Sequence, residues 1–194
     1  MKPKLIGITG GIGSGKSTVS EVLKHLNFKV YNSDLRAKEL LNEQINIRSK
    51  LIDYFSEDIF ENDELNTKLL SEKIFNNNSA LKKINSIIHP EVQKDFFLWV
   101  KKHSQNRLLF KESALLFESG TYKELDKVIL VTAKKKLRIS RVLNRDKNRS
   151  KQEVESIIYN QISEKEAIKY ADVIIDNNQK QMLLPKIIKE LDKL

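Results

Sequence analysis

Short apolar runs alternate with longer amphipathic stretches along this chain. Runs rich in Ile, Leu and Val that are too short for helices predict buried strands. The predicted strands are Lys4–Thr9, Lys29–Tyr31, Arg107–Glu112, Lys127–Thr132 and Val173–Asp176. Because helical segments separate these runs, the pattern predicts a parallel sheet in an α/β layered fold.

The amphipathic stretches predict helices. In Ser17–Leu26, apolar residues recur at i, i+3, i+4 and i+7 from Val19, which is typical of an amphipathic helix. Asn27 can close this helix in a left-handed conformation. Further helices are predicted at Leu35–Asn42, Ala133–Arg145, Lys151–Ile162 and Met182–Leu194.

Residues 45–105 are expected to be helical with short breaks and to form an insertion between two strands. Pro90 is expected at the first position of a helix within it. The apolar face of that helix would carry Val92, Phe96, Trp99 and Val100. The chain is long enough for one hydrophobic core with a small appended subdomain, and insertions of this kind often carry substrate sites.

Most of the glycines lie in one short segment near the N-terminus. Gly10–Ser17 matches G-x-x-x-x-G-K-[ST], the phosphate-binding P-loop, and lies between a predicted strand and a predicted helix. Glycine permits positive φ angles and lets phosphate oxygens approach the backbone N–H groups. Lys16 would reach the β- and γ-phosphates, and Ser17 would offer its hydroxyl to Mg²⁺. The sequence therefore predicts a nucleoside-triphosphate site that uses Mg²⁺.

Other nucleotide-binding classes lack their signatures here. The dinucleotide fingerprint G-x-G-x-x-G is absent, because Lys16 stands three residues after Gly13. A GTPase would carry D-x-x-G and N/T-K-x-D, and neither occurs. What remains is a small phosphotransferase, which needs an acid beside the acceptor hydroxyl and cations on the transferred phosphoryl group.

Two carboxylates that follow predicted strands are candidates for the catalytic site. Asp34 follows the second predicted strand, at the sheet edge where ligands bind, and could accept the proton of the attacking hydroxyl or hold Mg²⁺ through water. Alternatively, Ser33 or Asp34 could cap the following helix, and the residues alone leave both interpretations open. Glu112, at the end of the third strand, is a further candidate for a carboxylate near Mg²⁺.

Basic residues crowd one predicted helix and the loop after it. Arg138, Arg141 and Arg145 are spaced to share one helix face and could form a lid over a triphosphate. A solvated basic face and a nucleic-acid patch are the alternatives, and the lack of interleaved aromatic residues weighs against the second.

Composition limits the partners, the chemistry and the cellular location expected of this chain. The chain carries 35 Lys+Arg against 26 Asp+Glu, a net charge of +9 that favours polyanionic partners. It has no cysteine, which excludes disulfides, thiolate catalysis and cysteine-ligated zinc. It also has neither a membrane-spanning apolar run nor a signal-peptide pattern, so a cytoplasmic location is expected.

Several segments together resemble the dephospho-CoA kinase family, whose members transfer the γ-phosphoryl group of ATP to the ribose 3′-hydroxyl of dephospho-CoA. The matching segments keep the family's order over nearly the whole chain. They are Gly7–Val19, Val30–Asp34, Glu72–Phe75, Ile87–Val92, Ala114–Gly120, Asp126–Val131, Arg141–Asp146, and Gln161 with Ala171–Asn177.

The resemblance implies a three-layer P-loop kinase fold with a five-stranded parallel sheet. In a single domain, residues 1–44 and 106–194 would form the core, residues 45–105 a helical insertion that binds the acceptor, and residues 134–165 a small helical lid.

The resemblance also assigns site residues. It implies that Asp34 is the general base, that Lys16 and Arg145 stabilise the transferred phosphoryl group, and that Ser17 lies beside Mg²⁺. The residues expected to contact ATP are Gly11, Ile12, Gly13, Ser14, Gly15, Lys16, Ser17, Thr18, Arg141 and Asn177. Those expected to contact the acceptor are His89, Leu115, Leu116, Phe117 and Glu118.

Several positions depart from the family pattern. Asn32 stands where the first aspartate of an Asp-Ala-Asp run is usual, and Ala114 stands where a proline is usual. Asn66 and Thr67 replace a common Asp-Arg pair, which removes a cation on the acceptor side.

The leading hypothesis is ATP-dependent phosphorylation of dephospho-CoA with Mg²⁺. Its partners would be ATP and dephospho-CoA, with neither a nucleic acid nor a membrane involved. The close alternative is another small-molecule P-loop kinase that acts on a nucleoside or a nucleoside monophosphate. A nucleic-acid-binding ATPase is the alternative from a different class.

Overall fold

The computed structural model describes residues 2–61, 64–66, 69–70, 73, 77–179 and 182–193. The chain divides into two compact units. Unit 1 combines Met1–Asn32 with His103–Leu194, and unit 2 is Ser33–Lys102. Within the described ranges, no helix combines the length and the apolar character that crossing a bilayer demands.

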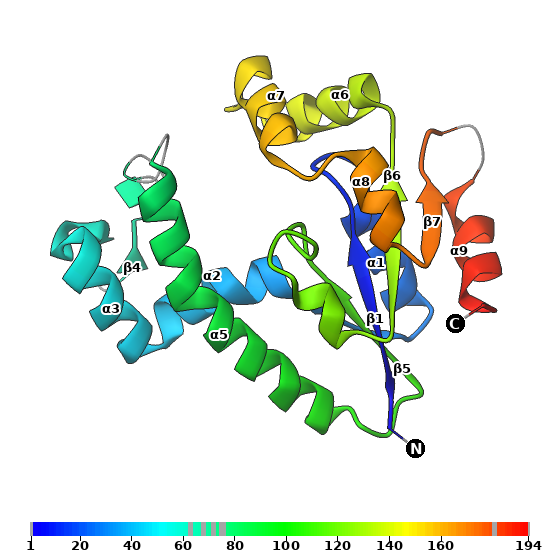
Figure 1. The fold of residues 1–194 in the computed structure, drawn as a ribbon, viewed down its shortest axis with the longest axis horizontal. Coiled ribbons are helices and arrows are strands. Elements are labelled where there is room, and N and C mark those ends of the chain that lie inside the picture. Colours follow the sequence, from blue (N-terminus) through cyan, green and yellow to red (C-terminus); the bar gives the residue numbers. More distant parts are fainter. Residues whose placement is uncertain are drawn as a thin grey trace. The chain divides into compact units, whose positions relative to one another are not determined.

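Unit 1 contains a five-stranded sheet (Figure 1). Its strands are β1 (Lys4–Thr9), β2 (Lys29–Asn32), β5 (Leu108–Glu112), β6 (Lys127–Thr132) and β7 (Val173–Asp176). The order is β2-β5-β1-β6-β7, and every neighbouring pair is parallel. The structure therefore confirms the parallel sheet and each of the five predicted strands, with bounds that agree within one residue.

Helices of unit 1 follow the strands in the predicted alternation. They are α1 (Lys16–His25), α6 (Lys135–Arg145), α7 (Lys151–Asn160), the short α8 (Glu164–Ala167) and α9 (Leu183–Leu191), with 3₁₀ turns η2 (Thr121–Glu124) and η3 (Ile168–Tyr170). Asn27 has a φ of 64° just beyond α1, as the left-handed cap requires. Ser150 and Glu153 form a capping box that starts α7.

The sheet of unit 1 is covered on both faces. Because side chains alternate along a strand, Ile129 and Val131 of β6 point to one face and Val128 and Leu130 to the other. The first face packs against apolar residues of α1 and α9, among them Val19, Leu23 and Ile187. The second packs against Leu116, Phe117 and Ala167, the last from α8. The result is the three-layer α/β architecture of P-loop kinases.

Unit 2 is mostly helical. Among its described residues, the elements are α2 (Ser33–Glu43), α3 (Ile45–Phe55), η1 (Glu57–Ile59), the short strands β3 (Phe60–Glu61) and β4 (Glu64–Leu65), and α5 (Asn78–Lys102). The antiparallel pair β3–β4 is a difference from the helical prediction.

The prediction for Pro90 was wrong. Pro90 lies inside α5 rather than at the start of a helix. A proline in a helix interior removes one backbone hydrogen bond. Ile87, Ile88 and Val92 are all buried around it, so packing on both sides of the proline holds the helix together.

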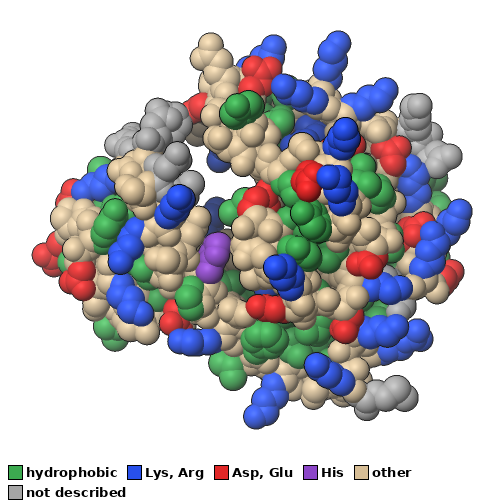
Figure 2. Space-filling model, in the orientation of Figure 1, with side chains coloured by type: hydrophobic (Ala, Val, Ile, Leu, Met, Phe, Trp, Pro, Cys, Tyr) green, Lys and Arg blue, Asp and Glu red, His purple; other side chains and the backbone are tan. Residues whose placement is uncertain are grey.

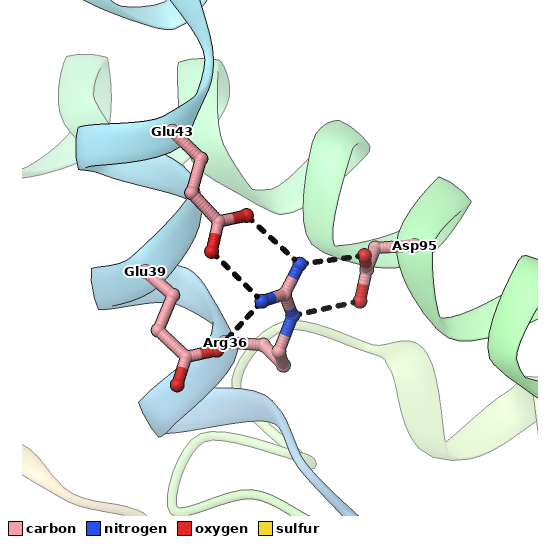
Figure 3. A network of polar contacts seen from close by, with 4 residues as sticks. All are labelled: Arg36, Glu39, Glu43 and Asp95. Atoms are coloured by element: carbon pink, nitrogen blue, oxygen red, sulfur yellow. Dashed lines mark hydrogen bonds and ion pairs between the residues drawn. The ribbon is translucent and has the colours of Figure 1, made fainter.

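One arginine links α2 to α5 in unit 2 (Figure 3). Arg36 forms two hydrogen bonds with the carboxylate of Asp95, from Nε at 3.1 Å and from Nη2 at 2.9 Å. Its Nη1 donates to Glu39 at 2.6 Å and to Glu43 at 3.3 Å. The carboxylates raise the pKa of Arg36, first Asp95 and then Glu39, so the guanidinium stays protonated at every working pH.

Replacing Arg36 with methionine is expected to lower the free energy of unfolding by about 1–3 kcal/mol, because three carboxylates lose their shared cation. Urea unfolding at pH 7 measures this loss. The matched control is Arg149→Met, which removes a surface ion pair with Asp146 and should cost less than about 1 kcal/mol. Equal losses in the two variants would refute a special role for Arg36.

Candidate nucleotide-binding site

The predicted P-loop connects β1 to α1 in unit 1. Its backbone turns back on itself, and the N–H of Ser14 donates to the carbonyl of Gly11 at 3.0 Å. Gly13 has a φ of 75°, and Gly15, which precedes α1, has a φ of 102°. These left-handed conformations favour glycine, which explains the glycine content of the segment. The arrangement directs the N-terminus of α1 at the loop, as an anion site requires.

Lys16 is the first residue of α1 and is buried, with 9% of its surface exposed. Its Nζ donates to the carbonyl of Gly10 at 2.8 Å. The ammonium group therefore lies against the loop, whose bound phosphates it is predicted to contact. A charge placed there in advance needs little reorganisation when an anion enters.

Ser17 belongs to a small polar cluster at the carboxyl ends of β2 and β5. Its Oγ donates to Oε1 of Glu112 at 3.0 Å, and Nδ2 of Asn32 donates to Oε2 of the same carboxylate at 3.2 Å. Asn32 and Glu112 are direct partners in the register of the two strands. Glu112 is only 3% exposed, so these two hydrogen bonds fix the orientation of a buried carboxylate.

Oxygen donors of this kind fit a hard cation such as Mg²⁺. Ser17 is an exposed residue, and its hydroxyl contacts the buried carboxylate of Glu112. Among the described residues, no group of three or more acidic or histidine side chains could hold a metal ion by itself. The donor set therefore suits a cation whose other ligands come from elsewhere, for example from phosphate oxygens.

Arg141 and Asn177 both contact the loop. Nη1 of Arg141 donates to the carbonyl of Ser14 at 3.2 Å, and its Nη2 donates to the carbonyl of Asn177 at 2.9 Å. Nδ2 of Asn177 also donates to the carbonyl of Ser14, at 2.9 Å. The structure thus brings both predicted ATP residues to the loop, although they are far from it in the sequence.

The arginines of α6 differ from one another. Arg145, at the C-terminal end of α6, is exposed, and its side chain makes no hydrogen bond or ion pair with the part of the chain that the structure describes. Arg138 instead turns towards the P-loop, where its Nε donates to the carbonyl of Ile12 at 2.9 Å. Burial lowers the pKa of Arg138, yet an arginine stays charged. Figure 2 shows Lys and Arg side chains gathered over α6 and α7.

The segment predicted to contact the acceptor is divided between the core and the surface. Leu116 is fully buried and Phe117 nearly so, and both pack against the sheet. Leu115 and Glu118 are exposed, and Oε1 of Glu118 accepts from the N–H of Ile162 at 3.0 Å.

A pocket lies beside the P-loop, within unit 1. Phe117 and Glu118 line it together with Gly10, Gly11 and Ser14 of the loop. The Oγ of Ser14 is buried and has no hydrogen-bond partner among the described residues.

The remaining predicted residues are placed as follows. Thr18 is exposed on the first turn of α1, and Ile12 is half-buried in the P-loop. Asp34 is exposed in the first turn of α2, and His89 is half-buried inside α5, both in unit 2. Thr67 lies outside the described residues, as does all of the matching segment Glu72–Phe75 except Lys73.

The sequence matches the family model for dephospho-CoA kinase over residues 4–182. The chain belongs to the dephospho-CoA kinase family. It is 39% identical to the dephospho-CoA kinase of Fusobacterium nucleatum, over 92% of this chain and 91% of the relative. It is 37% identical to that of Bacteroides fragilis, over 94% of this chain and 89% of the relative. This member of the family is therefore a kinase.

Solved structures agree with this assignment. A crystal structure of a Thermus thermophilus protein superposes with a TM-score of 0.87 at 30% identity, covering 100% of this chain and 98% of that one. The dephospho-CoA kinase of Campylobacter jejuni gives a TM-score of 0.72 at 27% identity, covering 97% and 96%. Shikimate kinase of Acinetobacter baumannii, at 16% identity and a TM-score of 0.53, shares the fold alone.

Proposed function

We propose that this chain transfers the γ-phosphoryl group of ATP to the ribose 3′-hydroxyl of dephospho-CoA, which gives coenzyme A and ADP. The observation that carries this proposal is the family match over residues 4–182, which includes the whole P-loop and its contacts with Arg141 and Asn177. The P-loop supports the triphosphate donor, and the family supports the acceptor.

The donor end would be bound by the loop. Backbone N–H groups of Gly11–Thr18 would surround the phosphates, and the ammonium of Lys16 would leave Gly10 to pair with the β- and γ-phosphates. Arg141 and Asn177, already on the loop backbone, would lie beside the nucleotide. The exposed guanidinium of Arg145 would stabilise the charge of the phosphoryl group as it moves.

Ser17 would hold Mg²⁺ through its hydroxyl, with Glu112 supporting that hydroxyl from behind. When bound, Mg²⁺ would neutralise charge on the β- and γ-phosphate oxygens. Asn32 would keep the second oxygen of Glu112 occupied, so that the first stays directed at Ser17.

Asp34, His89 and the segment Leu115–Glu118 would contact the acceptor. As the 3′-oxygen bonds to the γ-phosphorus, the bond from that phosphorus to the bridging oxygen breaks and ADP leaves with its electrons. Asp34 would accept the proton that the hydroxyl gives up. His89 would contact the acceptor within the helical region, as the resemblance implies.

An acceptor panel tests the proposed function. ADP release is measured with ATP and Mg²⁺ in the presence of dephospho-CoA, nucleosides or nucleoside monophosphates. Turnover is expected with dephospho-CoA and absent with its 3′-deoxy analogue, which lacks the reacting hydroxyl. Turnover on a nucleoside or nucleotide without turnover on dephospho-CoA would replace the proposed acceptor. Binding of DNA or RNA with a steep salt dependence would instead favour the nucleic-acid alternative.

Replacing Arg145 with alanine is expected to lower kcat by about 10²- to 10³-fold, because charge stabilisation in the transition state is lost. Steady-state kinetics with both substrates varied measures this. The matched control is Arg107→Ala, an exposed arginine at the N-terminal end of β5, which should leave kcat unchanged. An effect confined to the KM of the acceptor would contradict the role given to Arg145.

A further inference from the structure

One residue of the P-loop, Ile12, is held by side chains from outside the loop. Its N–H donates to Oε1 of Gln161 at 2.9 Å, and its carbonyl accepts from Nε of Arg138 at 2.9 Å. Nη2 of Arg138 also approaches Oε1 of Gln161, at 3.4 Å. Both backbone polar groups of Ile12 are therefore occupied by the two side chains, which also contact each other.

These two side chains come from the two ends of one helical hairpin. Arg138 lies in the first turn of α6, and Gln161 directly follows the last residue of α7. We call residues 135–160, which comprise α6 and α7, the lid hairpin. Arg145 lies further along this hairpin, at the end of α6. The contacts with Ile12 are thus made where the lid hairpin joins the rest of unit 1 (Figure 1).

The side chain of Ile12 makes a third connection. Ile139 and Val142 of α6 and Val154 of α7 form a small buried cluster inside the lid hairpin. Ile12 packs against this cluster, as do Leu143 and Ile158 from the hairpin itself. The apolar core of the hairpin therefore includes a residue of the P-loop.

Two glycines of the P-loop point to the same close contact. A Cβ atom on Gly11 would overlap the guanidinium of Arg138. A Cβ atom on Gly13 would overlap the carbonyl oxygen of Arg138, at a position where φ is also positive. The loop and the start of α6 are packed so closely that a Cβ atom at Gly11 would displace the guanidinium of Arg138, and a Cβ atom at Gly13 would meet backbone that cannot give way.

From these contacts we propose that Ile12, which is hydrogen-bonded to Arg138 and Gln161, couples the P-loop to the lid hairpin. A triphosphate bound in the loop then sets the position of the lid hairpin, and with it the position of Arg145. The inference rests on the proposed function only in taking ATP as the donor. A lid joined to the core by its chain ends alone would move independently of the loop. Here any shift of Ile12 on phosphate binding displaces two hydrogen bonds and an apolar contact of the hairpin.

Hydrogen–deuterium exchange tests the coupling without any acceptor. Exchange is followed in the loop (residues 10–18) and in the distal lid hairpin (residues 145–160), with and without Mg²⁺ and the non-hydrolysable analogue adenosine 5′-(β,γ-imido)triphosphate. In the unmodified protein, the nucleotide should slow exchange in both segments. In Gln161→Leu, protection of the loop should persist while protection of the lid hairpin falls by about 5-fold or more, the size of a typical coupling between sites.

Two further variants make this result specific. Gln161→Glu keeps an oxygen acceptor for Ile12 and Arg138, so nucleotide-dependent protection of the lid hairpin should return. Gln152→Leu makes the same change at an exposed position of α7 and should behave as the unmodified protein does. A merely structural role for Gln161 would lower the melting temperature and leave the two segments protected together.

Lid protection in Gln161→Leu equal to that of the unmodified protein would overturn the coupling. If Gln161→Leu does not fold, Arg138→Lys takes its place, because lysine keeps the charge but cannot contact both Ile12 and Gln161 as the guanidinium does. An unmodified protein in which the nucleotide protects the loop but not the lid hairpin would also overturn the coupling. Since no acceptor is present, failure on dephospho-CoA would leave these results unchanged.

Discussion

Replacing Asp34 with asparagine is expected to lower kcat by about 10²- to 10⁴-fold, the range that general-base catalysis contributes. The amide keeps the size of the side chain but cannot accept a proton at neutral pH. Because Asp34 lies outside the P-loop, which would bind ATP, the KM for ATP should change little. Single-turnover kinetics with radiolabelled ATP and dephospho-CoA separate the chemical step from product release.

Asp53→Asn is the matched control for this prediction. Asp53 is an exposed aspartate on α3 of the same unit, so the substitution makes the same change of charge without touching α2. It should leave kcat as it is. A normal kcat in Asp34→Asn would mean that Asp34 serves only the first turn of α2, where a carboxylate favours the helix dipole.

Replacing Lys16 with methionine is expected to lower kcat/KM by at least about 10³-fold, because the cation that we propose to pair with the β- and γ-phosphates is lost. The structure adds a second consequence. Nζ of Lys16 donates to the carbonyl of Gly10, so the variant also loses a buried contact within the loop. Nucleotide affinity, measured with a fluorescent ATP analogue, should fall together with kcat.

Lys24→Met controls for the loss of a lysine on the same helix. Lys24 is exposed on α1 and pairs with Glu21, away from the loop. This variant should retain activity and lose less than about 1 kcal/mol of stability. Unchanged nucleotide affinity in Lys16→Met would remove Lys16 from the donor site.

Local features of this chain were predictable from its sequence. The alternating burial of Val128, Ile129, Leu130 and Val131 follows from the strand repeat of two residues. The turn at Gly10–Ser17 follows from glycine's access to positive φ. Both depend on neighbours in the chain, so the sequence specifies them directly.

The sequence could not reveal what Asn32 contacts. The sequence indicated only that a carboxylate was missing. In the structure, Nδ2 of Asn32 donates to Glu112, which an ionised aspartate could not do. Glu112 is adjacent to Asn32 because β5 lies between β2 and β1, an order that the sequence does not contain.

The partner of Arg138 and the place of Pro90 within its helix both depend on packing that the sequence does not show. Helical spacing placed Arg138 on one face with Arg141 and Arg145, but it could not reveal that the P-loop packs against that face. Gln161 belongs to a segment that resembles the family, but nothing local in the sequence signals its bond to Ile12. The sequence around Pro90 predicts a helix start, but buried apolar residues on both sides of the proline keep α5 continuous.

By itself, the sequence determined the five strands, the donor loop and the family to which the chain belongs. Only the tertiary structure decided which side chains hold that loop, namely Arg138, Arg141, Gln161 and Asn177. The physical reason is the range of the interactions. Backbone conformation depends on a few consecutive residues, whereas these hydrogen bonds join residues that become neighbours only after the sheet and the lid hairpin have formed.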